Sequence, residues 1–238
     1  MAQPTPIYIA ASPRPRVGKT VLARLLVEFF RSGGRPVGAY DLNPREPVLA
    51  GYFPQLVAPI DIADTHGQMV LFDQLIARRP VTRVVDVGYG AYDQFFGVMA
   101  EIGFVREARR RMMEPVVLFA ADRAAATVRA YADLRRRLPD VTIVPVHNEF
   151  VSVTCDKDDF PPTRTACRMI RIPRLSQLVR GVIDRPSFSF AAYLEATPGT
   201  PTEIHGWVAG IFNEFRELEL RLLMGTLGAS LSRGGGDW

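Results

Sequence analysis

The fold is decided by residues 7–31, which read IYIAASPRPRVGKTVLARLLVEFFR. Residues 7–11 form a short apolar run, and the loop that follows is rich in proline and arginine and ends in Gly18-Lys19-Thr20. From Lys19 to Arg31, large apolar side chains recur at helical spacing. They are Leu22, Leu25, Leu26, Phe29 and Phe30. The stretch therefore predicts a strand, a loop and a helix in direct succession.

The same alternation continues along the chain. Further strands are predicted at residues 36–40, 82–87, 116–121, 141–146 and 168–172. Further helices are predicted at residues 66–79, from residue 91 to about 113, at 123–138 and at 202–224. Because apolar strands alternate with amphipathic helices, we expect an α/β fold with a doubly wound, mostly parallel sheet and helices on both faces. We expect one domain over residues 1–231 and a Gly-rich tail over residues 232–238.

The composition favours a soluble cytoplasmic protein. Hydrophobic residues make up 47% of the chain but occur in short runs, well below the roughly 20 consecutive apolar residues of a membrane span. The first residues have neither a basic segment nor a long apolar segment, so they do not resemble a signal peptide. Cys155 and Cys167 are the only cysteines and lack C-x-x-C spacing. The three histidines lie far apart in sequence, so no metal site is expected from them.

The loop at residues 12–20 has the features of a phosphate-binding loop. It leads into a helix N-terminus, where backbone N–H groups and the helix dipole favour an anion. In the P-loop pattern, Gly18 permits close backbone approach, Lys19 neutralises phosphate oxygens and Thr20 offers its hydroxyl to magnesium. We therefore predict that ATP and Mg²⁺ bind here. The predicted nucleotide contacts are Arg14, Pro15, Arg16, Val17, Gly18, Lys19, Thr20 and Val21.

Two features of this loop are unusual. Lys19 and Lys157 are the only lysines in a chain with 29 Lys and Arg residues, so a lysine at this junction indicates a need for a compact ammonium group. Pro13 and Pro15 remove backbone N–H donors that such a loop offers to phosphate. The arginines at positions 14 and 16 add positive charge that offsets this loss.

The loop resembles that of the deviant Walker A ATPases of the ParA/MinD group, which reads K-G-G-x-G-K-[ST]. The corresponding residues here run from Arg14 to Thr20, so Arg14 falls at the family's signature lysine. In that family the lysine reaches across a dimer to phosphates bound by the other subunit. The resemblance implies catalytic roles for Arg14 and Lys19. Matches follow the family's order through residues 7–175, and the plasmid partition and mobilisation-type ATPases look most similar.

Acidic residues end two of the predicted strands, and the resemblance implies that they take part in magnesium and water binding. Residues 41–45, DLNPR, resemble D-x-D-P-Q, which implies that Asp41 positions magnesium-bound or attacking water. Residues 84–88, VVDVG, resemble the family's apolar strand that ends in Asp and Gly. This match implies that Asp86 supports magnesium through water and that the Gly88 N–H senses the γ-phosphate. Turn formation by Asp41 and helix capping by Asp86 remain open as structural alternatives.

A further strand end offers a candidate for base recognition. Residues 144–148, VPVHN, resemble the segment whose strand-end Asn reads adenine in this group, so Asn148 is a predicted nucleotide contact. A structural role for Asn148 is equally open. Residues 172–173, Ile-Pro, resemble the segment that follows in the family.

The resemblance implies an ATP-dependent switch, in which ATP favours a homodimer and slow hydrolysis releases it. Its output would be binding to DNA or to a partner protein. One alternative is a nucleotide-binding scaffold without hydrolysis, which is favoured by Pro13, Arg14, Pro15 and Asn43. Another is an ATP-dependent ligase similar to dethiobiotin synthetase, which shares the loop and fold class. That family carries a lysine after its second strand, where this chain has Asn43 and Arg45.

Two basic clusters are candidates for non-specific contact with DNA. They are Arg106 with Arg109–Arg111, and Arg135–Arg137. Such clusters attract phosphate backbones, but they also occur on solvated helix faces. The predicted helix at 202–224 carries mixed charges, which favours core packing or dimerisation over attachment to a membrane surface. We therefore expect no stable membrane insertion.

Overall fold

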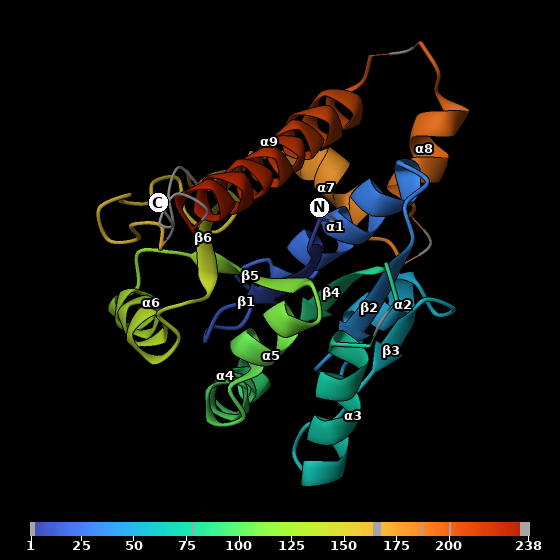
Figure 1. Cartoon of the computed structure of the whole chain (residues 1–238). Coiled ribbons are helices and arrows are strands. Elements are labelled where there is room, and N and C mark those ends of the chain that lie inside the picture. Colours follow the sequence, from blue (N-terminus) through green and yellow to red (C-terminus); the bar gives the residue numbers. More distant parts are fainter. Residues whose placement is uncertain (1–2, 78, 164–167, 187, 200, 234–238) are drawn as a thin grey trace.

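The computed structural model describes residues 3–77, 79–163, 168–186, 188–199 and 201–233. Within these residues the chain forms a seven-stranded sheet with the order β3-β2-β4-β1-β5-β6-β7, and every neighbouring pair is parallel (Figure 1). The strands are β1 (Thr5–Ala11), β2 (Val37–Asp41), β3 (Val57–Pro59), β4 (Thr82–Asp86), β5 (Met113–Ala121), β6 (Thr142–Asn148) and β7 (Ile170–Ile172). The predicted doubly wound α/β fold is confirmed.

Helices cover both faces of the sheet (Figure 1). On one face lie α1 (Lys19–Ser32), α2 (Val48–Tyr52), α7 (Gln177–Ile183), α8 (Phe190–Ala196) and α9 (Glu203–Arg233). On the other face lie α3 (Thr65–Leu75), α4 (Tyr92–Glu101), α5 (Phe104–Arg110) and α6 (Ala125–Arg137). A single 3₁₀ turn at Tyr89–Ala91 precedes α4. Each face therefore has its own hydrophobic core.

The apolar run in strand β1 is buried on both faces of the sheet. Tyr8 and Ala10 point into the core beneath α1 and α9, while Ile7, Ile9 and Ala11 point into the core beneath α3–α6. Side chains alternate between the two faces of a strand, and here both faces are covered. All five side chains are at most 1% exposed. A central position in the sheet thus requires an unbroken apolar run.

The predicted helix that ran to about Met113 is wrong in its second half. Helix α4 ends near Ile102, and Gly103 adopts a left-handed conformation with φ of 61° before α5 begins. Glycine is the residue that most readily takes this conformation at a helix end. Met113 is the first residue of β5. The chain therefore has two short helices where one was predicted.

Four short elements lie outside the predicted strands and helices, and the last helix is longer than predicted. Strand β3 and helices α2, α7 and α8 have between three and seven residues, too few for a clear periodic signal. Helix α9 continues to Arg233, so residues 232–233 belong to it and not to the predicted tail. Glycines within α9 cost about 1 kcal/mol each and do not by themselves end a helix. Residues 234–238 and Cys167 lie outside the described residues.

Helix α9 packs on the core, which is one of the two roles that its mixed charges favoured. Phe212 and Phe215 contact Phe29 of α1 edge-on, at ring distances of 5.2 and 5.5 Å. The indole N–H of Trp207 donates to the Pro173 carbonyl at 2.7 Å. Within the described part of the chain, no helix is both long and apolar enough to cross a membrane.

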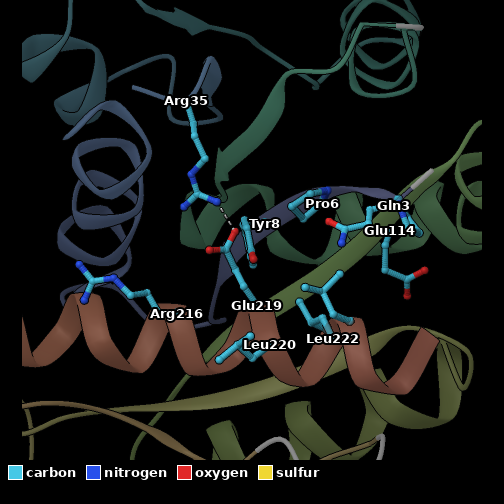
Figure 2. A pocket seen from close by; sticks show the side chains of 11 residues that line it. Gln3, Pro6, Tyr8, Arg35, Glu114, Arg216, Glu219, Leu220 and Leu222 are labelled. Carbon is cyan, nitrogen blue, oxygen red and sulfur yellow. Dashed lines mark hydrogen bonds and ion pairs between the residues drawn. The ribbon is translucent and has the colours of Figure 1, made fainter. Parts of the chain in front are cut away.

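A cavity of about 390 Å³ lies between α9 and the beginning of β1 (Figure 2). Pro6 and Tyr8 line it from the strand, and Leu222 lines it from the helix. The guanidinium of Arg35 forms an ion pair with Glu219 at its edge, at 2.7 Å. The beginning of β1 is the opposite end of that strand from the loop at residues 12–18, so this cavity is separate from the predicted phosphate site.

Candidate phosphate-binding site

Gly18 shapes the start of α1. It is the residue that precedes the helix, with φ of 92°, and its carbonyl accepts from the Leu22 N–H at 3.0 Å. A Cβ atom at this position would lie 2.1 Å from Nδ2 of Asn148. Both the left-handed conformation and the close approach of Asn148 therefore require glycine.

Lys19 begins α1 and is buried, with 7% of the residue exposed. Its ammonium group donates to the carbonyl oxygen of Arg14 at 2.5 Å. Burial lowers the pKa of Lys19 to about 8, and the nearby charge of Asp86 partly opposes this shift. The ammonium group thus lies against the backbone of the loop at residues 12–18.

Asp86 ends β4 and is 4% exposed. Burial raises the pKa of this carboxyl group to about 7. A hydrogen bond from Thr20 and the charge of Lys19 lower the pKa, whereas the charge of Asp41 raises it. Among the described residues, its Oδ1 atom has no hydrogen-bond partner. A buried carboxylate oxygen without a partner, beside a threonine hydroxyl, fits a magnesium ligand or a ligand to magnesium-bound water.

Asp41 lies beside Asp86, because the two residues pair in register at the ends of β2 and β4. Its Oδ1 atom accepts from the N–H of Asn43 at 3.1 Å. Its Oδ2 atom accepts from the N–H groups of Leu49 and Ala50 at 2.9 and 3.3 Å. Burial raises the pKa of Asp41, and these three bonds oppose the rise. Asp41 therefore joins the end of β2 to the first turn of α2, the turn-forming role that the sequence left open.

Asn148 ends β6 and contacts the loop at residues 12–18. Its Nδ2 group donates to the Val17 carbonyl at 3.3 Å, and its Oδ1 atom accepts from the Phe150 N–H at 3.1 Å. Its amide is thus engaged with backbone, and a contact with adenine stays a prediction. The preceding His147 bonds the Ser152 carbonyl at 2.8 Å through Nε2.

Arg14 is held by a residue that the sequence analysis did not select. Its guanidinium forms an ion pair with Asp122 at 2.5 Å, and the side chains are 44% and 3% exposed respectively. Asp122 follows the last residue of β5, which pairs with β1. Like Asp41 and Asp86, Asp122 lies at the carboxyl end of an apolar strand, and this position is the sequence signal that could have found it. In this structure Arg14 contacts its own chain.

The remaining predicted contacts lie along the same loop. Pro15 and Arg16 are exposed, and Arg16 has a φ of 59°, which is rare for a residue with a side chain. Val17 is buried, and Val21 packs against the core beneath α1. In the part of the chain that the structure describes, no group of three His, Cys, Asp or Glu residues forms a metal site. Bound magnesium would therefore need further oxygen ligands from phosphate and water.

No family model matches the chain, and no curated protein matches its sequence. Among solved structures, the chain is similar to a nucleotide-binding protein from Archaeoglobus fulgidus, solved in complex with ADP and with cobalt, at 15% identity and a TM-score of 0.44. The match covers 83% of this chain and 93% of that chain. At this level of similarity, the function has to be inferred from the site itself.

The low pKa of Lys19 predicts how pH affects the stability of the protein without nucleotide. The pKa is about 8 in the folded state and 10.5 in the reference state, so the unfolded chain binds more protons between these values. The contribution of Lys19 to the free energy of unfolding therefore rises with pH across this window, by on the order of 3 kcal/mol. Urea titrations of wild type and Lys19→Met between pH 7 and 10.5 should show wild type gaining stability relative to the variant. Parallel pH profiles would contradict the prediction.

Proposed function

We propose that this protein binds a magnesium nucleoside triphosphate, ATP in the first instance, at residues 12–20. The observation that carries the proposal is the grouping of Lys19, Thr20 and Asp86 at the start of α1, directly after the left-handed Gly18. A buried cation and the N-terminus of a 14-residue helix favour a polyanion. A neighbouring buried carboxylate favours its metal counter-ion.

Each residue has a distinct part in this proposal. The N–H groups at the start of α1 and the ammonium group of Lys19 hold the phosphates. Thr20 would hold magnesium, Asp86 would support it directly or through water, and Asp41 would position a magnesium-bound water. Magnesium supplies charge neutralisation at the phosphates. The pKa of Asp86 is about 7 without the metal, and a bound divalent cation favours its ionised form.

Slow ATP hydrolysis is the finer part of the proposal, with Lys19 and Asp41 as catalytic residues. One observation favours the second candidate, a nucleotide-binding scaffold without turnover. Both carboxylate oxygens of Asp41 already accept backbone hydrogen bonds. Only their remaining lone pairs could orient an attacking water. Phosphate release separates the two candidates.

A homodimer that forms with ATP, and non-specific DNA as its partner, also belong to this proposal. The first basic cluster has much of its charge paired within the chain: Arg109 bonds Glu114, while Arg110 and Arg111 lie near Glu107. Pairing of this kind weakens an electrostatic DNA surface. Sedimentation and a mobility shift with unrelated duplexes, each with and without MgATP, are the tests. If the protein stays monomeric with MgATP and binds no DNA, both the homodimer and the DNA partner are excluded.

The experiment that tests the main proposal is calorimetry of the wild-type protein with ATP and ADP, with and without magnesium. Saturable one-site binding that magnesium strengthens is expected. Phosphate release measured on the same samples then distinguishes the slow ATPase from the scaffold. If neither nucleotide binds, residues 12–20 do not form a nucleotide site and the proposal is wrong.

A further inference from the structure

Arg14 is fixed in the loop from three sides. Its guanidinium pairs with Asp122 at 2.5 Å, and its carbonyl oxygen accepts from the Lys19 ammonium group at 2.5 Å. Its backbone N–H donates to the hydroxyl of Ser12 at 3.4 Å. Asp122 and Lys19 are thus connected through a single residue. A displacement of Arg14 would also displace the carbonyl group that orients Lys19.

The sequence of the loop explains why such a restraint is needed. Pro13 and Pro15 have no backbone N–H, so they cannot stabilise the loop by donating hydrogen bonds. Arg16 has a φ of 59°, which disfavours the observed conformation for a residue with a Cβ atom. Positions 13 and 15, on either side of Arg14, therefore donate no backbone hydrogen bonds that would hold the loop. The ion pair from the Arg14 side chain supplies a restraint that does not depend on such donors.

Asp122 is well placed to act as the fixed end of this pair. It is 2% exposed, and its Oδ1 atom accepts from the Ala124 N–H at 2.9 Å. It directly follows β5, whose pairing with β1 extends to the match of Ala11 with Phe119. The carboxylate thus belongs to the rigid centre of the sheet. Its Oδ2 atom is the one that reaches Arg14.

We propose that Asp122 is a positioning residue of the nucleotide site, an inference that rests on the proposed function. Through Arg14, Asp122 holds residues 13–17 in the conformation that seats the Lys19 ammonium group. Asp122 does not contact the nucleotide, and Arg14 stays with Asp122 when nucleotide binds. The loop is therefore organised before nucleotide arrives, and the ion pair contributes equally to ATP and ADP affinity.

Limited proteolysis tests this restraint without any nucleotide. The Arg16–Val17 bond is a trypsin site in the loop, whereas Arg14 precedes a proline and is not cut. Val17 is 3% exposed, so cleavage requires local opening, and its rate reports the open population. Asp122→Asn should speed cleavage at Arg16–Val17 by about tenfold, since it removes a charge-assisted bond but keeps an acceptor for Ala124. An unchanged rate would overturn the proposal.

Two controls make this result specific. Cleavage after Arg45, in the exposed turn that follows β2, should keep its wild-type rate in Asp122→Asn. A matched variant, Asp133→Asn, removes an ion pair to Arg136 on the surface of α6 and should leave cleavage after Arg16 unchanged. Faster cleavage at every site in Asp122→Asn would indicate global destabilisation and would also overturn the proposal.

A double-mutant cycle on nucleotide affinity tests whether the Arg14–Asp122 ion pair supports nucleotide binding. Asp122→Asn and Arg14→Gln should each weaken MgATP and MgADP about tenfold, and the double variant should be no weaker than either single one. Arg14→Lys should restore part of the loss, because an ammonium group can still pair with Asp122. Tighter ATP binding by Asp122→Asn would mean that Asp122 competes with phosphate for Arg14, which overturns the proposal. If wild type binds no nucleotide, the proposed function fails, and the proteolysis result still decides whether Asp122 restrains the loop.

Discussion

Replacing Lys19 by alanine is expected to weaken MgATP binding at least about a hundredfold, which corresponds to roughly 3 kcal/mol. The ammonium group of Lys19 is buried inside the loop, where water screens its attraction for phosphate only weakly. Its lowered pKa of about 8 leaves it largely protonated at pH 7. Calorimetry at pH 7 with magnesium measures the change.

The chain provides a natural control for this experiment. Lys157, the only other lysine, lies in the exposed loop after β6, so Lys157→Ala should keep wild-type affinity. Far-UV circular dichroism should show both variants folded. Burial of the Lys19 ammonium costs free energy in the protein without nucleotide, so its removal does not threaten the fold. Affinity within threefold of wild type in Lys19→Ala would mean that the loop does not bind phosphate through this residue.

Replacing Arg24 by alanine is expected to lower the free energy of unfolding by about 3 kcal/mol. Arg24 projects from α1 and is 3% exposed. Its guanidinium donates to the carbonyl groups of Ile183 and Phe188 at 2.6 and 2.5 Å. It also stacks on Tyr52 at 3.8 Å from the ring centre. One side chain thus joins α1 to α2 and to the segment between α7 and α8.

Urea unfolding measures the effect of Arg24→Ala, with Arg31→Ala as the matched control on the same helix. Arg31 is exposed and lies 5.8 Å from the centre of the Phe53 ring, so its removal should cost less than about 1 kcal/mol. Arg24→Ala loses two charge-assisted bonds and leaves the carbonyl groups of Ile183 and Phe188 without these donors. A loss below 1 kcal/mol for Arg24→Ala would show that the network contributes little to stability.

The sequence identified the central part of the fold for a simple physical reason. Strands buried on both faces must be apolar throughout, and the crossover helices must present an apolar stripe to the sheet. These demands leave a periodic signal over long elements such as α1, which was predicted within a residue of its observed start and end. They leave none in β3 or α2, whose three and five residues are too few to show a period.

The candidate site likewise combines features that the sequence indicated with contacts that only the tertiary structure shows. The sequence by itself determined the strand, loop and helix around Gly18, Lys19 and Thr20, because chain connectivity and local chemistry are enough to build that unit. It also indicated Asp41 and Asp86, because residues 41–45 and 84–88 resemble two acidic motifs of the ParA/MinD group. Only the tertiary structure decided that Arg14 pairs with Asp122, 108 residues away, and that Asn148 closes on Gly18. Such contacts depend on the order of strands in the sheet, which local sequence patterns do not encode.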